Sequence, residues 1–392
     1  MPTGLLILVS TSARALVQAA RRTGLPACAV DAFGDVDTLA QVERWHRCAL
    51  AADGGLDADS VMDAIAGFGP EPATIVLGSG LESRPDVIAR IEARHTLAGN
   101  AATVWRLAHD PQRWSALALS LGLPCPAMCW APPADAACWL RKRAGSSGGQ
   151  HVLPASAQAN RANVADEGWY FQRRIEGEAY SLLFLADGQD MLGIGFNRLL
   201  AAPPEAGLPW AWAGAVRPAG LDAGVRLRVL HAAQVLTQAF GLRGLNGLDF
   251  VVQGEDWFLL ELNPRPTATL DLWDVGPMPP LLDLHFRACA GQLPSALPQL
   301  TDARALAVAY AGVPVQLPMD AVWPEACRDR PRGGVQIQAG EPLCTLHACA
   351  ATASAAVAQV LASRRNLLRD LGCASADAAC APERPDLVGM RA

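Results

Sequence analysis

Lysine is almost absent from this sequence of 392 residues. Lys and Arg together number 32, and Lys142 is the one lysine among them. Heavy use of Ala, Arg and Pro indicates a GC-rich coding bias, which replaces Lys by Arg wherever either charge is adequate. Lys142 is therefore the position at which a property specific to lysine is most to be expected.

Several further absences narrow the class of protein. The formal net charge is -6 and no run of five like charges occurs, which argues against a nucleic-acid partner. No apolar run reaches transmembrane length, and the opening MPTGLLILVS lacks the basic n-region and cleavage site of a signal peptide. The 11 cysteines include no C-x-x-C pair, which disfavours zinc and a disulfide framework. We expect a cytoplasmic protein with no membrane partner.

The hydrophobic pattern of the first hundred residues predicts an open α/β domain. An apolar strand at 4–10 precedes an amphipathic helix that ends at Gly24, and a second strand follows at 26–33. A further helix and strand occupy 61–82, and the segment from 85 to Gly99 is expected to be helical. We therefore predict a Rossmann-like domain over residues 1–97.

The pattern then changes to antiparallel β structure. Asp110 and Pro111 open a helix as N-cap and N1 residues, and ADGQD predicts a hairpin turn between two apolar strands. A long amphipathic helix closes at Gly241, and a second hairpin turns at GED, residues 254–256. The expected units are a first lobe at 98–172, a second lobe at 173–295, a small C-terminal β and helix unit at 296–373, and a loose tail at 374–392.

The second hairpin brings oxygen ligands together. A turn near Glu255 sets Asp249 opposite Glu261, and Glu261 shares a face with Asn263 because side chains alternate along a strand. Hard oxygen donors without His or Cys suit Mg²⁺. Arg265 follows as a fixed cation suited to the charge that develops on a transferred phosphoryl group. Taken alone, each acidic residue is more often a solvated strand or turn charge.

Lys142 ends an apolar strand and precedes the glycine-rich loop formed by Gly145, Ser146, Ser147, Gly148 and Gly149. Backbone N–H groups in such a loop can approach phosphates, and lysine supplies a compact charge. A flexible hairpin turn with a surface lysine is the alternative. The order of residues differs from a Walker A loop, and a lone loop histidine such as His151 is more often solvated.

Together these residues resemble the ATP-grasp superfamily. The resemblance rests on Lys142 with its glycine-rich loop, the connector at 170–178, Asp249, and the segment Glu261-Leu-Asn-Pro-Arg265. It covers about residues 98–290 and implies an N-terminal pre-ATP-grasp domain followed by a two-lobed ATP-grasp domain. More weakly, the segments SARALVQAARRTG and IQAGEPLCTLHA look like a branch linked to methanopterin and methanofuran one-carbon metabolism.

The resemblance assigns ligands to ATP and metal. Asp249, Glu261 and Asn263 would hold one or two Mg²⁺, with Mn²⁺ as an alternative ion. Relatives often carry a lysine near DPQRW, where this chain offers only Arg113 or Arg106, and a ribose-binding glutamate near Ala179, where it offers Glu178 or Glu176. The implied ATP contacts are Lys142, Gly145, Ser146, Ser147, Gly148, Gly149, Gln172, Arg173, Ile175, Glu178 and Arg113.

The implied reaction is ATP-dependent joining of a carboxylate to an amine through an acylphosphate, with Lys142 and Arg265 as catalytic residues. The small-molecule substrate is expected to be an amino acid or a cofactor precursor, with Arg198, Arg217 and Glu82 as candidate contacts. The alternatives are bicarbonate activation as in biotin carboxylases, phosphoryl transfer without ligation, and a nucleotide-binding regulatory protein without turnover. The sequence leaves open whether the chain forms a homodimer.

Overall fold

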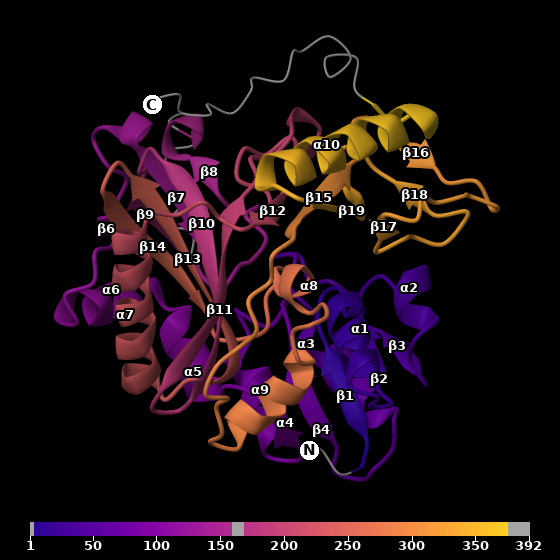
Figure 1. Cartoon of the computed structure of the whole chain (residues 1–392), viewed down its shortest axis with the longest axis horizontal. Helices are drawn as coiled ribbons and strands as arrows, with labels where there is room; N and C mark the ends of the chain where they lie inside the picture. The colour runs from indigo at the N-terminus through magenta and orange to yellow at the C-terminus, as the bar shows by residue number, and fades with distance from the viewer. Residues whose placement is uncertain (1–3, 159–167, 375–392) are drawn as a thin grey trace.

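A computed structural model of the chain describes residues 4–158 and 168–374 (Figure 1). Most of the tail predicted at 374–392 lies outside these residues. Within the two described ranges, no helix combines the length and the apolar character that crossing a bilayer requires. The predicted fold class is confirmed, because a parallel sheet near the N-terminus is followed by antiparallel sheets.

The N-terminal segment folds around a parallel sheet with the strand order β3-β2-β1-β4-β5. Its inner strands are buried along their whole length because helices cover both faces. From β1 the chain proceeds through β2 to β3 on one side and then returns to place β4 on the other side of β1, which makes the β1/β4 edge a topological switch point. The elements are β1 (Leu6–Val9), α1 (Arg14–Arg22), β2 (Cys28–Asp31), α2 (Val36–Leu39), β3 (Trp45–Arg47), α3 (Ala58–Ala66), β4 (Thr74–Leu77), α4 (Pro85–Glu92) and β5 (Thr96–Leu97).

The prediction that the helix continues to Gly99 is wrong. Helix α4 ends at Glu92, and β5 then pairs with β4 in parallel. Gly99 has φ +147°, a conformation that no helix accommodates, and α5 (Ala102–Ala108) starts after it. Two short elements therefore replace the end of one long helix.

A small antiparallel sheet carries Lys142 and the segment that leads to the connector. Its strand order is β6-β9-β7-β8. The helix predicted after Asp110 is confirmed, because the Asp110 carboxylate accepts hydrogen bonds from the N–H groups of Gln112 and Arg113. The elements are α6 (Pro111–Ser120), β6 (Met128–Cys129), η1 (Ala136–Cys138), β7 (Trp139–Arg143), β8 (Leu153–Pro154), η2 (Ala155–Gln158) and β9 (Trp169–Arg173).

The central sheet is antiparallel, with the strand order β14-β13-β10-β11-β12-β15-β19-β17. Both predicted hairpins are confirmed, with turns between β10 and β11 and between β13 and β14. Helix α7 ends as predicted at Gly241, which adopts φ +64°. The elements up to residue 290 are β10 (Glu178–Asp187), β11 (Met191–Leu199), η3 (Pro204–Ala206), β12 (Gly214–Arg217), α7 (Ala223–Phe240), β13 (Arg243–Gln253), β14 (Asp256–Asn263), α8 (Leu270–Trp273) and α9 (Leu281–Cys289).

The two faces of the central sheet belong to different cores. Tyr180, Leu182 and Phe184 of β10 pack in the cluster that contains the apolar side of α7. Leu183 and Leu185 pack instead with α9 and the N-terminal domain. The alternation of side chains thus assigns every residue of β10 and of its neighbours to one side or the other.

The C-terminal segment continues the central sheet. Strand β15 pairs with β12, and β19 pairs with β15, while α10 lies across these strands (Figure 1). The predicted β strands and closing helix of this segment are present. Strands β15, β19 and β17 belong to the same sheet as the Asp249 hairpin, whereas β16 and β18 pair with each other. The elements are β15 (Ala303–Tyr310), β16 (Val315–Gln316), β17 (Cys327–Arg328), β18 (Gln336–Ile337), β19 (Pro342–Ala350) and α10 (Ala353–Asp370).

Candidate functional site

The hairpin of β13 and β14 places the carboxylates of Asp249 and Glu261 side by side. The two residues are direct cross-strand partners, as the spacing predicts. Asn263 Nδ2 donates a hydrogen bond to Asp249 Oδ2 at 3.1 Å. Burial, together with the neighbouring negative charge of Glu261, raises the pKa of Asp249 to about 7. The positive charges of Arg265 and Lys142 act in the opposite direction.

The same face of the sheet carries a polar row that extends away from the acidic pair. Ser181 is the cross-strand partner of both Asp249 and Asn197. Asn197 Nδ2 donates to Ser181 Oγ at 3.1 Å, and the Trp273 indole N–H donates to Asn197 Oδ1 at 2.8 Å. Buried polar groups of this kind need partners, so the row fixes the side-chain positions beside Asp249.

Arg265 joins the acidic hairpin to the N-terminal domain. Its Nε donates to Glu82 Oε1 at 2.8 Å, and one terminal nitrogen donates to Asn263 Oδ1 at 3.0 Å. Glu82 Oε2 also accepts the Gly80 N–H at 2.7 Å. Glu82, expected as a substrate contact, is thus placed as the ion-pair partner of Arg265 in the loop that follows β4.

Lys142 is buried in the small sheet and not on the surface. Its side chain is 8% exposed, and Nζ donates to Gln172 Oε1 at 3.1 Å. Gln172 is 1% exposed, and its Nε2 is buried without a hydrogen-bond partner. Cross-strand pairing puts Lys142 and Tyr170 on this same face. The surface-lysine alternative does not describe this residue.

The glycine-rich loop packs tightly against two other segments. A Cβ atom at Gly145 would lie 2.7 Å from Ser83 Cα, and one at Gly149 would lie 1.7 Å from the Trp210 carbonyl oxygen. The Trp212 N–H donates to the Gly148 carbonyl at 2.9 Å. The loop therefore docks on the chain beside Glu82 and on the segment after β11. Ser146 and Ser147 are half-buried within it.

The lysine sheet and the acidic hairpin meet at the loop after β4, because Gly145 packs against Ser83 and Arg265 donates to Glu82. Burial raises the pKa of Tyr170, and the charges of Lys142 and Glu261 both act on it, in opposite directions. Burial lowers the pKa of His151, on which Glu261, Lys142 and Glu82 all act. One site is thus assembled from strands more than a hundred residues apart.

His109 is a residue of this site that the sequence pattern did not indicate. It follows α5, its Nδ1 hydrogen-bonds to the Trp105 carbonyl at 2.9 Å, and its Nε2 is buried without a partner. Burial lowers its pKa, and the charges of Glu82 and Glu261 act to raise it. No local motif marks this histidine, because its surroundings come from distant strands.

The connector candidates Arg173 and Ile175 lie at the end of β9 and just after it. Arg173 is exposed, and its backbone N–H donates to the Ala127 carbonyl at 2.8 Å. Ile175 is half-buried in the irregular segment between β9 and β10, and Glu176 is exposed. The backbone contacts to adenine expected here stay a prediction.

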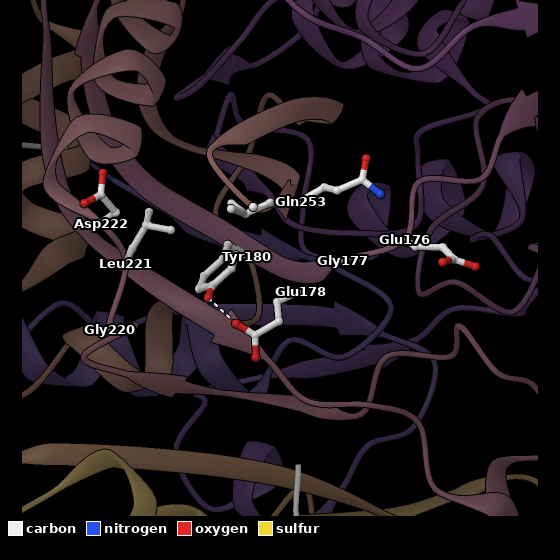
Figure 2. A pocket seen from close by; sticks show the side chains of 10 residues that line it. Glu176, Gly177, Glu178, Tyr180, Gly220, Leu221, Asp222 and Gln253 are labelled. Carbon is white, nitrogen blue, oxygen red and sulfur yellow. Dashed lines mark hydrogen bonds between the residues drawn. The ribbon is translucent and has the colours of Figure 1, made fainter. Parts of the chain in front are cut away.

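The placement of Glu178 does not support the expected ribose contact. The residue begins β10 on the face of Tyr180, opposite to that of Ser181 and Asp249. It accepts a hydrogen bond from the Tyr180 hydroxyl at 2.6 Å, and both residues line an open pocket of about 470 Å³ beside Asp222 (Figure 2). Strand alternation, which the spacing of the connector did not reveal, is the reason.

The arginines expected to replace a first-lobe lysine are engaged elsewhere. Arg113 lies on the exposed side of α6, 3.4 Å from the Asp110 carboxylate. Arg106 pairs with Asp86 at 2.7 Å, and both side chains are largely exposed. The structure therefore does not bring either arginine together with Lys142.

Of the two arginines proposed for a substrate carboxylate, Arg217 lies on the face of the central sheet that carries Asp249, and Arg198 lies on the other face. Arg217 is 1% exposed, and its nitrogens donate to the Leu272 carbonyl and to the carbonyl and carboxylate of Asp302. Arg198 is the cross-strand partner of Tyr180, so its side chain leaves the sheet on the face opposite Asp249. Arg217 is thus held by groups of the protein, and the substrate role of both arginines stays a prediction.

The donor set fits a magnesium ion shared with phosphates. Asp249 and Glu261 offer carboxylate oxygens, and Asn263 Oδ1 carries a hydrogen bond from Arg265 that a metal ion would share or displace. Within residues 4–158 and 168–374, no three His, Cys, Asp or Glu side chains are grouped to hold a metal by themselves. Magnesium often completes such a site with waters and substrate oxygens.

Comparisons with known proteins agree with this arrangement. Residues 115–269 match a family described as the ATP-grasp domain. No curated protein matches the chain in sequence.

Solved structures share the fold. Biotin carboxylase of Campylobacter jejuni, in a complex with β-γ-ATP, has a TM-score of 0.66 and 16% identity over 90% of this chain and 89% of that one. The biotin carboxylase domain of Hydrogenobacter thermophilus 2-oxoglutarate carboxylase, a dimer with MgADP and bicarbonate, has a TM-score of 0.67 and 14% identity over 91% and 89%. Rhizobium etli pyruvate carboxylase has a TM-score of 0.70 and 15% identity over 92% of this chain, which spans 37% of that chain.

Proposed function

Since residues 115–269 form an ATP-grasp domain, we propose that the chain is an ATP-dependent ligase that joins a carboxylate to an amine through an acylphosphate. The observation that carries the proposal is the convergence of Lys142 with the Asp249 and Glu261 carboxylates in one buried site. A lone lysine, two adjacent carboxylates and a glycine-rich loop form a set suited to a metal-bound polyphosphate.

The proposed reaction has two steps. A substrate carboxylate oxygen attacks the γ-phosphorus of ATP, the bond to the β–γ bridging oxygen breaks, and ADP leaves with the electron pair. The amine nitrogen then attacks the acyl carbon, the bond to the phosphate oxygen breaks, and phosphate leaves while the nitrogen loses a proton. The product is an amide.

The side chains of the site support these steps by position and charge. Asp249, Glu261 and Asn263 would hold Mg²⁺, which neutralises phosphate charge and orients the polyphosphate when bound. Lys142 is fixed by Gln172 at 3.1 Å and would bind phosphate from the opposite side. Arg265, held by Glu82 and Asn263, supplies a fixed cation beside the metal ligands.

Substrate-dependent product release tests the ligase. Purified chain is incubated with Mg-ATP, a panel of amino acids and cofactor precursors, and hydroxylamine or ammonium as the amine, after thermal-shift screening for ligands. ADP and phosphate released only when acid and amine are both present support the proposal. Tight ATP binding without ADP release under every combination would instead favour a regulatory nucleotide-binding protein.

Bicarbonate activation is the second candidate, because the biotin carboxylase fold covers about nine-tenths of this chain. Bicarbonate would take the place of the carboxylate in the first step. A ring nitrogen would take the place of the amine in the second step. Release of ADP with bicarbonate alone, and labelled carboxylate on added biotin, would identify this reaction. Release that requires an organic acid and an amine would exclude it.

A further inference from the structure

Three of the buried polar atoms that lack a hydrogen-bond partner in the described residues belong to one site. They are Gln172 Nε2, His109 Nε2 and His151 Nδ1. Buried polar atoms are normally paired, so a group of them in one place indicates a ligand that completes the bonding. The Gln172 amide is oriented by Lys142 through its oxygen and cannot change its charge, whereas the two histidines can take up a proton.

His109 has one ring nitrogen, Nε2, without a hydrogen-bond partner. Its Nδ1 is 2.9 Å from the Trp105 carbonyl, which can only accept, so the proton of the neutral ring is on Nδ1 and Nε2 carries a lone pair. The charged groups that act on the ring are Glu82, Glu261 and Arg265. His109 directly follows α5, which contacts β14.

His151 follows the glycine-rich loop, two positions after Gly149. The charged groups that act on it are Glu261, Lys142 and Glu82, so two of the three are shared with His109. The loop is held in place where Gly145 abuts Ser83, the residue next to Glu82. The two rings therefore lie close to one charged centre although they are 42 positions apart in the sequence.

The centre is short of positive charge for a polyphosphate. Asp249, Glu261 and Glu82 contribute carboxylates, whereas Lys142 and Arg265 contribute the cations, and Arg265 is already paired with Glu82. The sequence contains no second lysine, and Arg113 and Arg106 pair with other carboxylates. Phosphate oxygens would favour any nearby group that can become positive.

We propose that His109 and His151 each take up a proton from solvent when nucleotide phosphates enter the site, and so supply the cations that this chain lacks. The proposal rests on the proposed function only in requiring that nucleotide binds here. Burial lowers the pKa of both rings, which keeps them neutral near pH 7 before binding, and the negative phosphates then favour the charged form. Each charged ring donates a hydrogen bond from the nitrogen that is unpartnered in this structure.

Linkage makes the proposal measurable without knowledge of the acid or the amine. If binding takes up a proton, nucleotide affinity falls as pH rises, by up to about tenfold per pH unit for each proton. Mg-ADP is the probe, because it cannot complete turnover. Calorimetric titration at pH 7.5 in two buffers with different ionisation enthalpies gives the number of protons taken up per nucleotide.

The variants remove the ring nitrogen that would take up the proton but keep a polar side chain at each position. His109→Asn preserves a donor toward the Trp105 carbonyl, and His151→Gln preserves a polar side chain in the loop. His231→Gln, on the exposed side of α7, is the matched control. We expect measurable proton uptake in the wild-type chain and in the control, a smaller uptake in each single variant, and none beyond the titration of the nucleotide itself in the double variant.

The outcomes separate the two proposals. Mg-ADP binding without proton uptake in the wild-type chain, or unchanged uptake in the double variant, overturns the role of the histidines and leaves the nucleotide site standing. Absence of Mg-ADP binding overturns the proposed function itself. Imidazole ¹⁵N spectra of the wild-type chain read the same change without any substitution: two rings must pass from the neutral to the charged pattern on addition of Mg-ADP.

Discussion

Arg265 and Glu82 lie 183 residues apart in the sequence and form a buried ion pair, with Arg265 Nε donating to Glu82 Oε1 at 2.8 Å. Glu82 follows β4 at the switch point of the parallel sheet, and Arg265 follows the acidic hairpin of the central sheet. The pair therefore ties the N-terminal domain to the metal-binding side of the candidate nucleotide site.

Glu82→Gln should destabilise the fold more than loss of an exposed pair does. The substitution leaves the Arg265 guanidinium buried without its counter-charge, for which we expect a loss of about 3 kcal/mol in the free energy of unfolding. Asp86→Asn is the control, because Asp86 pairs with Arg106 in an exposed position and should cost below about 1 kcal/mol. Urea unfolding of both variants measures the difference, and equal losses would contradict the assignment.

Lys142→Arg should weaken nucleotide binding and abolish ATP turnover while the fold stays intact. The guanidinium is wider than the ammonium group and does not fit the buried position beside Gln172, so we expect affinity for Mg-ADP to fall at least about tenfold. Circular dichroism tests whether the fold is intact, and calorimetric titration measures the affinity for Mg-ADP. Arg21→Lys, an exposed exchange on α1, should change neither, and unchanged activity of Lys142→Arg would mean that the lone lysine is an accident of composition.

Gly149→Ala and Gly148→Ala separate backbone strain from loop docking. Both glycines have φ +72°, so each alanine carries a similar left-handed cost of about 1 kcal/mol. Only at Gly149 would the new Cβ meet another segment, 1.7 Å from the Trp210 carbonyl oxygen. We expect Gly149→Ala alone to undock the loop, seen as faster proteolytic cleavage within 144–152 and weaker Mg-ADP binding. Equal effects of the two variants would show that docking is not the cause.

The buried His285 should make stability fall in mild acid. Its Nδ1 accepts from the Leu245 N–H at 2.8 Å and its Nε2 hydrogen-bonds to the Ala98 carbonyl at 3.0 Å, and burial lowers its pKa to about 4. The unfolded chain binds the proton near pH 6.5, so the stabilisation is complete above that pH and is lost as pH falls toward 4.

The slope that His285 adds is about 1.4 kcal/mol per pH unit within that window. Urea unfolding at intervals between pH 7.5 and 4.5, compared with His285→Gln, isolates it from the carboxylates that titrate in both proteins. Parallel pH profiles for the two proteins would contradict the prediction.

Local patterns in the sequence were sufficient for the hairpin that carries the acidic pair. The apolar runs on either side of the turn at residues 254–256 predict the hairpin, and a register shift between Asp249 and Phe250 then brings Asp249 opposite Glu261. The capping residues Asp110 and Gly241 likewise marked the helix ends correctly. These features depend on neighbours within about a dozen residues.

Such local patterns do not predict contacts between distant segments. The direction of Arg198 follows from its pairing in β11, and the engagement of Arg217 follows from Asp302, neither of which a motif records. His109 precedes an ordinary helix cap, and only the packing of α5 against β14 brings it near Glu261. The charge of each residue is known from its type, but the sequence does not show on which face of the sheet its side chain lies.

The pairing of β12 with β15 has a consequence for how the chain reaches this structure. β12 ends at Arg217 and its second neighbour begins at Ala303, so during synthesis the edge of β12 is open until the following helices and the C-terminal strands have left the ribosome. An open strand edge is a template for pairing with another chain. A chain cut after residue 290 would retain every candidate nucleotide ligand and yet end in an unprotected edge, so its failure would be aggregation and not an inability to recognise nucleotide.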